Sequence, residues 1–257
     1  MTAADSAAIR VVGLTGLPEV QSGDDLVALT LGAVDRDRLV VQSGDVFVFT
    51  QKIVSKAEGR SIRLDEVTPS RLAQEWGEAW GRDPRTIELA LGEATRIVRM
   101  DRGVLITETR HGFVCANSAV DTSNVRPGEA ARLPVNPDES ARRLCTALRA
   151  TFQFPVGVVI SDTFGRPWRE GQVNVAIGTA GMRPIVDYRG TADSHGQPLR
   201  STIVAVADEV ASAAELVMGK TSGIPVAVVQ GTGLGVGAVG EYSGRDLLRR
   251  REEDLFR

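Results

Sequence analysis

Three uninterrupted runs of apolar residues predict β-strands. The run at residues 46–50 follows a Gly-Asp turn and reads Val-Phe-Val-Phe-Thr, which combines β-branched and aromatic side chains. Residues 155–160 and 225–229 form two further runs, each opened by a proline. All three are far too short to cross a bilayer, so they indicate buried strands of a folded core.

Apolar residues that recur three and four positions apart predict four helices. The first begins at a Thr-Pro pair and places Trp76 and Trp80 on its apolar face, where both rings are expected to pack in the core or between lobes. The third begins with a capping box opened by Asn136. The helices are expected at residues 68–80, at 83–92, from 136 to just before 155, and at 202–218.

A hairpin is predicted around His111, because residues 104–109 and 113–116 flank a short loop that contains a glycine. His111 is therefore expected at the surface.

Strands and helices are interspersed along the chain without regular βαβ alternation, repeats or a low-complexity linker. The pattern favours a mixed α+β fold with largely antiparallel sheets. A length of 257 residues suggests one domain over residues 1–257, which could comprise two intimately joined lobes.

Composition and charge point to a small-molecule partner. The chain is 42% hydrophobic and 25% charged, with a net charge of −3, as in an ordinary globular protein. Such a balance offers no global field for nucleic acid or an anionic membrane. Residues 1–10 lack the basic region of a signal peptide, and Cys115 and Cys145 form no CxxC motif. We therefore expect a cytoplasmic protein with reduced thiols.

Two glycine patterns suggest nucleotide binding but lack the required context. Residues 235–240 match GxGxxG, yet only 17 residues follow, too few for a helix, a second strand and a ribose-binding acid. The sequence Gly219-Lys220-Thr221 resembles the end of a P-loop, but Ala214 stands where the first glycine is required. A turn is the simpler interpretation of residues 231–240. A flavin or nicotinamide oxidoreductase built on these glycines remains an alternative.

Two aspartate-centred segments carry the more specific chemistry. Asp121 begins Asp-Thr-Ser-Asn-Val, and Asp162 lies in Ser-Asp-Thr-Phe-Gly-Arg, at the predicted end of the 155–160 strand. Carboxylate and hydroxyl oxygens are ligands that Mg²⁺ and Mn²⁺ prefer, often together with phosphate oxygens. The simpler alternative is that both aspartates form turns or caps. Arg166 and Arg169 could neutralise a phosphate or form ion pairs.

The lysines are a further signal, because only three of the 30 basic residues are lysine: Lys52, Lys56 and Lys220. A compact ammonium suits a phosphate as a point charge where a broad guanidinium does not fit. The alternative is that three lysines remain by chance.

Several motifs together resemble the coenzyme F420:L-glutamate ligase family, in the right order and over nearly the whole chain. The motifs lie at residues 16–20, 52–60, 120–125, 161–169, 205–220 and 224–229. The resemblance implies a GTP- and divalent-metal-dependent ligase that adds L-glutamate to the phospholactate end of a deazaflavin precursor and then γ-links further glutamates. It also implies an acyl-phosphate intermediate, an intertwined α+β homodimer, Mg²⁺ or Mn²⁺ as cofactor, and K⁺ as a further candidate.

Carried over residue by residue, the resemblance assigns a metal and a nucleotide site. Asp121 and Asp162 would hold one divalent cation, Thr163 would contribute to a second, and Lys56 would act with both aspartates in catalysis. Residues 218–225 would close over the nucleotide. The nucleotide contacts would be Leu17, Pro18, Glu19, Val20, Gln51, Lys56, Asn124, Met218, Gly219, Lys220 and Thr221.

Two positions depart from the commoner family pattern. Gln51 stands where many members have serine, and an amide can replace that hydrogen-bonding group. Lys220 stands where some members have glutamine near the second cation. Because a protonated amine cannot ligate a metal, either water completes that second site or Lys220 holds phosphate charge instead. Lys52 receives no firm role. A non-catalytic nucleotide-binding module is a third interpretation of the chain.

Overall fold

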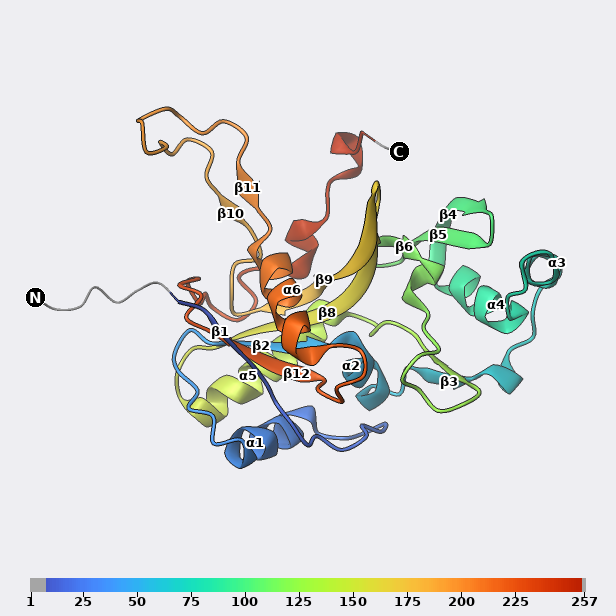
Figure 1. Ribbon diagram of the computed structural model, residues 1–257, viewed down its shortest axis with the longest axis horizontal. Helices are drawn as coiled ribbons and strands as arrows, with labels where there is room; N and C mark the ends of the chain where they lie inside the picture. Colours follow the sequence, from blue (N-terminus) through green and yellow to red (C-terminus); the bar gives the residue numbers. More distant parts are fainter. Residues whose placement is uncertain (1–7, 256–257) are drawn as a thin grey trace, which may run out of the picture.

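A central five-stranded sheet organises the protein, whose computed structural model describes residues 8–255 (Figure 1). β2 and β8 are parallel, whereas every other neighbouring pair is antiparallel. In spatial order the strands are β1 (Arg10–Gly13), β12 (Val226–Gln230), β2 (Val46–Thr50), β8 (Gly157–Arg166) and β9 (Arg169–Ala180). All three strands predicted from apolar runs are confirmed, and β8 extends beyond its prediction.

Helices cover both faces of this sheet. Helices α1 (Leu26–Arg36) and α5 (Pro137–Phe152) pack on one face, and α6 (Val206–Met218) packs on the other (Figure 1). Within β2, Phe47 and Phe49 belong to the first core, whereas Val46 and Val48 belong to the second. Successive side chains of a strand point to opposite faces, so a strand covered on both sides must be apolar throughout.

A smaller lobe stands beside the main sheet (Figure 1). Its own core gathers Ala73, Ile87, Ala90 and Leu105. The predicted antiparallel hairpin is confirmed as β5 paired with β6. The lobe comprises α3 (Arg71–Trp80), α4 (Pro84–Glu93), β4 (Ala94–Asp101), β5 (Val104–Thr109), β6 (Val114–Ala116) and the short 3-10 helix η2 (Asn117–Ala119). The α+β class with mixed, largely antiparallel sheets is thus confirmed, while the division into lobes within one domain stays a prediction.

Three local predictions need correction. The side chain of Trp80 is 45% exposed, because its ring covers the turn at Gly103 at the rim of the lobe rather than entering the core. His111 is half-buried, because its Nε2 contacts the carbonyl oxygens of Pro134 and Val135. Helix α6 begins at Val206, because the preceding residues form β11 (Ile203–Val204) against β10 (Val186–Asp187).

The remaining elements link these layers. Helix α2 (Gln51–Ala57) is followed along the chain by β3 (Ser61–Arg63). Strand β3 pairs antiparallel with β7 (Glu129–Ala131). The other 3-10 helices are η1 (Leu64–Glu66), η3 (Gly244–Leu247) and η4 (Arg251–Glu253). Within residues 8–255, no helix combines the length and the apolar character needed to cross a membrane. The prediction for residues 1–10 falls mostly on residues outside the described range.

The close packing of β9 on α5 yields a stability prediction. A Cβ added at Gly178 would lie 2.5 Å from the backbone of Pro137, so Gly178→Ala must push the helix away from the sheet. Overpacking of this kind costs about 1–3 kcal/mol. The matched control is Gly32→Ala in α1, which meets nothing within 4 Å and should stabilise by about 0.5–1 kcal/mol. Urea unfolding should show a lower free energy of unfolding than the wild type for Gly178→Ala and a higher one for Gly32→Ala. Equal changes in the two variants would contradict this packing.

Candidate active site

The site begins where β2 passes directly into α2. Thr50 is both the last residue of β2 and the N-cap of the helix, so no loop separates them. Lys52 and Lys56 lie four residues apart, which places them on one face of α2. Both lysines therefore follow the strand directly, on a helix that the sequence analysis did not predict.

Asp162 and Thr163 lie on β8 just beyond its last pairing with β2, which joins Thr50 to Ser161. The strand was expected to end at this point. Instead it continues to Arg166, because β9 keeps pairing with it and places Asn174 opposite Thr163. Asp162 therefore projects from a paired β-ribbon, and its Oδ1 accepts a 2.8 Å hydrogen bond from the backbone N–H of Thr163.

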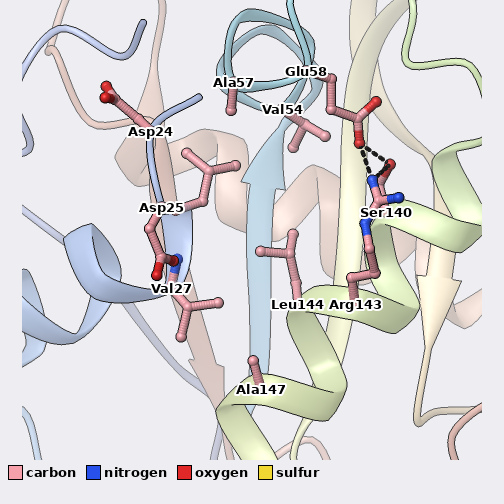
Figure 2. Close-up of a pocket in the computed structure, with 11 residues that line it drawn as sticks. Asp24, Asp25, Val27, Val54, Ala57, Glu58, Ser140, Arg143, Leu144 and Ala147 are labelled. Atoms are coloured by element: carbon pink, nitrogen blue, oxygen red, sulfur yellow. Dashed lines mark hydrogen bonds and ion pairs between the residues drawn. The ribbon is translucent and has the colours of Figure 1, made fainter. Parts of the chain in front are cut away.

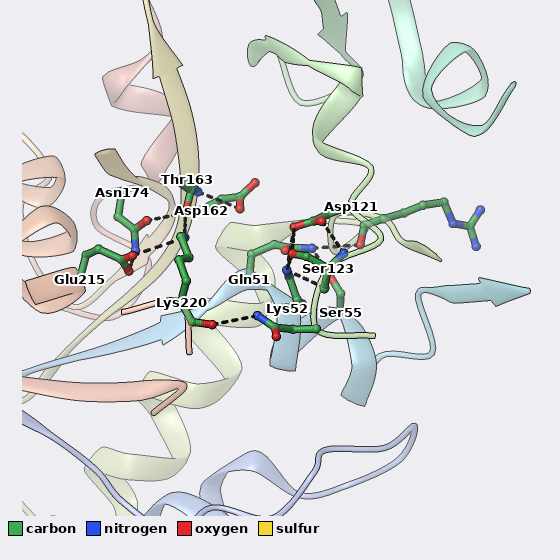
Figure 3. Close-up of polar contacts among 12 residues, drawn as sticks. Gln51, Lys52, Ser55, Asp121, Ser123, Asp162, Thr163, Asn174, Glu215 and Lys220 are labelled. Atoms are coloured by element: carbon green, nitrogen blue, oxygen red, sulfur yellow. Dashed lines mark hydrogen bonds and ion pairs between the residues drawn. The ribbon is translucent and has the colours of Figure 1, made fainter. Parts of the chain in front are cut away.

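Asp121 belongs to a turn that is pinned to β7. Its backbone pairs with Ala131, and its Oδ1 accepts a 2.7 Å hydrogen bond from the N–H of Ser123. The turn interpretation of this aspartate is thus correct. Its other oxygen, Oδ2, accepts a 2.7 Å hydrogen bond from the ammonium of Lys52, which also contacts the carbonyl and hydroxyl oxygens of Ser123 (Figure 3).

The two aspartates have opposite electrostatic environments. Burial alone would raise the pKa of Asp121, but the hydrogen bonds from Lys52 and Ser123 outweigh it and hold the pKa below its ordinary value. Burial raises the pKa of Asp162 to about 7, and the charge of Asp121 adds to the rise. The metal-free site therefore holds one firmly ionised carboxylate beside one that readily takes up a proton.

The predicted nucleotide loop at residues 17–20 meets α2 through an ion pair. The ammonium of Lys56 contacts the carboxylate of Glu19. Lys56 is only 12% exposed, whereas Pro18 and Glu19 are exposed. Leu17 and Val20 instead pack against the main core, which anchors the loop. The structure thus brings together Glu19 and Lys56, two residues that the resemblance assigns to the nucleotide, and that assignment stays a prediction.

The other predicted nucleotide contacts differ in how they are presented. Gln51 is 2% exposed, and its amide donates to the hydroxyl of Ser55 and the carbonyl of Arg132. Met218, the last residue of α6, is buried in the core. Gly219, Lys220 and Thr221 are exposed. The amide of exposed Asn124 lies 3.4 Å from the carbonyl oxygen of Lys220, which joins the two segments.

The donor set fits a hard divalent cation that keeps several water or phosphate ligands. No group of three or more acidic, histidine or cysteine side chains among residues 8–255 is arranged to hold a metal. Mg²⁺ is typically bound through only one or two carboxylates, with water and substrate phosphates completing its shell. Asp121 and Asp162, with the Thr163 hydroxyl nearby, supply that kind of site.

Three residues of the site received no role in the sequence analysis. Lys52 contacts Asp121, Asn174 accepts a hydrogen bond from Thr163, and Glu215 accepts one from Asn174. The spacing of Lys52 and Lys56 was a usable signal, because residues four apart share a helix face. Nothing in the sequence marks Asn174, and Glu215 was noted only as part of the 205–220 motif. The two residues reach the site from β9 and α6.

Other sequence candidates lie outside this group of residues. The guanidinium of Arg166 donates to the carbonyl of Glu170 within the β8–β9 hairpin, and Arg169 is exposed at its tip. Residues 231–240 have no regular helix or strand, which agrees with the rejection of a dinucleotide fold.

A separate cavity of about 310 Å³ lies between α1, α2 and α5, with Glu58 and Arg143 paired at its wall (Figure 2).

Comparison with known proteins identifies the class and then the family. The family model described as F420-0:Gamma-glutamyl ligase matches residues 15–231. The chain is 44% identical to the "Coenzyme F420:L-glutamate ligase" of Methanothermobacter thermautotrophicus over 97% of this chain and 99% of that protein. The protein of the same name from Methanocaldococcus jannaschii is 41% identical over 97% of both chains. The chain is thus an amide-forming ligase. It belongs to the F420-0:gamma-glutamyl ligase family.

The opposite environments of the two aspartates yield a pH prediction for the metal-free protein. The pKa of Asp162 is near 4 in the unfolded chain and about 7 in the folded protein, so ionisation of Asp162 destabilises the fold. This destabilisation is absent at low pH, grows between the two pKa values and is complete above them. Asp162→Asn should therefore stabilise the protein in chelator at about pH 8, with a smaller gain at about pH 5.

Asp121→Asn is the matched control. Its lowered pKa means that the ionised group stabilises the fold above its unfolded pKa, so this variant should lose stability at about pH 8. Urea unfolding of both variants and the wild type in excess chelator measures the difference. A destabilised Asp162→Asn variant at the higher pH would show that its carboxylate is not buried at a cost.

Proposed function

We propose that this protein is a GTP-dependent ligase that joins L-glutamate to the phospholactate carboxylate of the deazaflavin coenzyme F420 precursor and then adds γ-linked glutamates. The observation that carries the proposal is the grouping of Asp121, Asp162, Lys52 and Lys220 where β2 and β8 diverge, with Lys56 one helical turn after Lys52 on α2. Membership of the family and the names of its relatives supply the substrate class.

The reaction needs an activated carboxylate, because a carboxylate ion is a poor electrophile. An oxygen of the precursor carboxylate attacks the γ-phosphorus of GTP, and the bond from that phosphorus to the β–γ bridging oxygen breaks to release GDP. The amine of glutamate then attacks the acyl-phosphate carbonyl, phosphate leaves with the bonding electron pair, and the amine loses a proton. The product is an amide.

The side chains of the site would act mainly by positioning and electrostatics. Lys56, held beside the loop of Glu19, would neutralise the nucleotide phosphates, since an ammonium serves as a compact point charge. Asp121 and Asp162 would hold a Mg²⁺ or Mn²⁺ ion, which when bound draws charge from the phosphate oxygens. Preorganised charge of this kind is the main source of catalysis in phosphoryl transfer.

We further propose a cytoplasmic homodimer, with K⁺ as an additional candidate cation. Two projections of the chain support the dimer: the β8–β9 hairpin and the β10–β11 arm extend from the body (Figure 1). The hairpin tip carries Trp168, which is 83% exposed, and the arm exposes Tyr188 and Ile203. Large apolar side chains in projecting segments are typical of surfaces that pack against a partner.

The activity is tested by incubating the protein with GTP, Mg²⁺, L-glutamate and the precursor, and by following the products with mass spectrometry. We expect species heavier by one and then more glutamyl residues, with GDP released in equal number. Calorimetry should show GTP binding that is lost in excess chelator, because the aspartates would hold a cation that offsets the charge of the nucleotide phosphates.

ATP in place of GTP, and NADH as a ligand, serve as controls. Equal GTP affinity with and without chelator would contradict the metal bridge, and tight NADH binding without glutamate addition would favour an oxidoreductase. GTP binding without any product would favour a non-catalytic nucleotide-binding module.

Lys56→Ala should weaken GTP binding about tenfold to a hundredfold, because it removes one charge-assisted phosphate contact. Lys56→Arg should restore only part of the affinity, since the guanidinium is wider. Arg71→Ala is a control for loss of a surface cation, because that side chain is 91% exposed on α3. Dissociation constants at saturating Mg²⁺ measure the series, and unchanged affinity in Lys56→Ala would assign the phosphate contact to another residue.

A further inference from the structure

Four side chains close a polar ring beside Asp162. The hydroxyl of Thr163 donates to the Oδ1 of Asn174 at 2.7 Å, and the amide of Asn174 donates to the Oε2 of Glu215 at 2.8 Å. The Oε1 of Glu215 lies 3.4 Å from the ammonium of Lys220, and that ammonium donates to the hydroxyl oxygen of Thr163. Figure 3 shows the ring next to the Asp121 and Lys52 group.

Each member of the ring comes from a different segment. Thr163 and Asn174 face each other on β8 and β9, Glu215 lies in the last turn of α6, and Lys220 follows that helix. Donors and acceptors match around the whole ring. The hydroxyl of Thr163 donates its proton to Asn174, and a lone pair of the same hydroxyl oxygen accepts from Lys220. The ammonium of Lys220 is thus held in place by the hydroxyl of Thr163 and paired with the carboxylate of Glu215.

The ammonium of Lys220 contacts the hydroxyl oxygen of Thr163, which a second metal ion would need as a ligand. Among the side chains of the ring, Thr163 and Glu215 are the oxygens that face Lys220, and both already accept its contact. A divalent ion on Thr163 would therefore be next to a like charge. It would also have to displace Lys220 from its carboxylate, so the ring disagrees with a second metal site.

We propose that the ammonium of Lys220 takes the place of a second metal ion, so that the chain binds one divalent cation, at Asp121 and Asp162. The inference rests on the proposed function in one respect, namely that the charge at this place faces phosphate. Lys220 is then a positioning charge that is built into the chain and always present, whereas the aspartate site depends on the metal supply.

The number of Mn²⁺ ions bound per chain tests the proposal. Paramagnetic resonance titration of free Mn²⁺ gives this number, with and without GDP. The wild type should bind one ion. Lys220→Gln, which removes the charge and offers a carbonyl oxygen, should bind two, and Lys220→Arg, which keeps the charge, should bind one. Because Lys220 is 59% exposed, these variants should fold, and their melting temperatures verify it.

Two results would overturn the proposal: a second ion in the wild type or in Lys220→Arg, or a single ion in Lys220→Gln. Asp162→Asn locates the first ion, because its count should fall to zero. The manganese count requires neither turnover nor GTP. Failure of glutamate addition with one ion bound would therefore contradict the proposed function alone, whereas two bound ions in an active enzyme would contradict the role of Lys220 alone.

Discussion

The parallel pairing of β2 with β8 is the constraint on which the rest of the site depends. The two strands run in register from Val46 and Gly157 to Thr50 and Ser161, and at that point they diverge. β2 passes into α2, which carries Lys52 and Lys56, and β8 continues as a ribbon that carries Asp162. A slip of one residue would send every side chain of the strand to the opposite face, so the buried cores on both sides fix the site as well.

Charge is distributed within the site by pairing each lysine with an acid. Lys52 contacts Asp121, Lys56 contacts Glu19, and Lys220 contacts Glu215. The only three lysines of a chain otherwise rich in arginine are thus each paired with an acid. Elsewhere arginine performs the structural work, as where Arg60, Arg110 and Arg132 surround the buried carboxylate of Glu93. A planar guanidinium suits such fixed, buried pairs, and a compact ammonium suits a phosphate.

Similarity to relatives extends over nearly the whole chain, so the family accounts for the architecture as a whole. Individual side chains then decide how this member performs its chemistry. The aspartates form an asymmetric pair because Lys52 reaches only Asp121, while burial acts on Asp162 without a comparable partner. Lys220 extends that asymmetry by placing a fixed positive charge next to the carboxylate that is less readily ionised.

The amino-acid sequence alone determined the local elements and the motifs. The apolar runs identified β2 and β12, the Asn136 capping box identified the start of α5, and the aspartate segments identified Asp121 and Asp162, because each signal lies within a few consecutive residues. Only the tertiary structure decided that β8 continues past Asp162, that Lys52 contacts Asp121, and that Asn174, Glu215 and Lys220 form a ring of contacts with Thr163. The hydrogen bonds among these side chains join residues 11 to 69 positions apart, and they exist because sheet pairing and helix packing bring separate segments together.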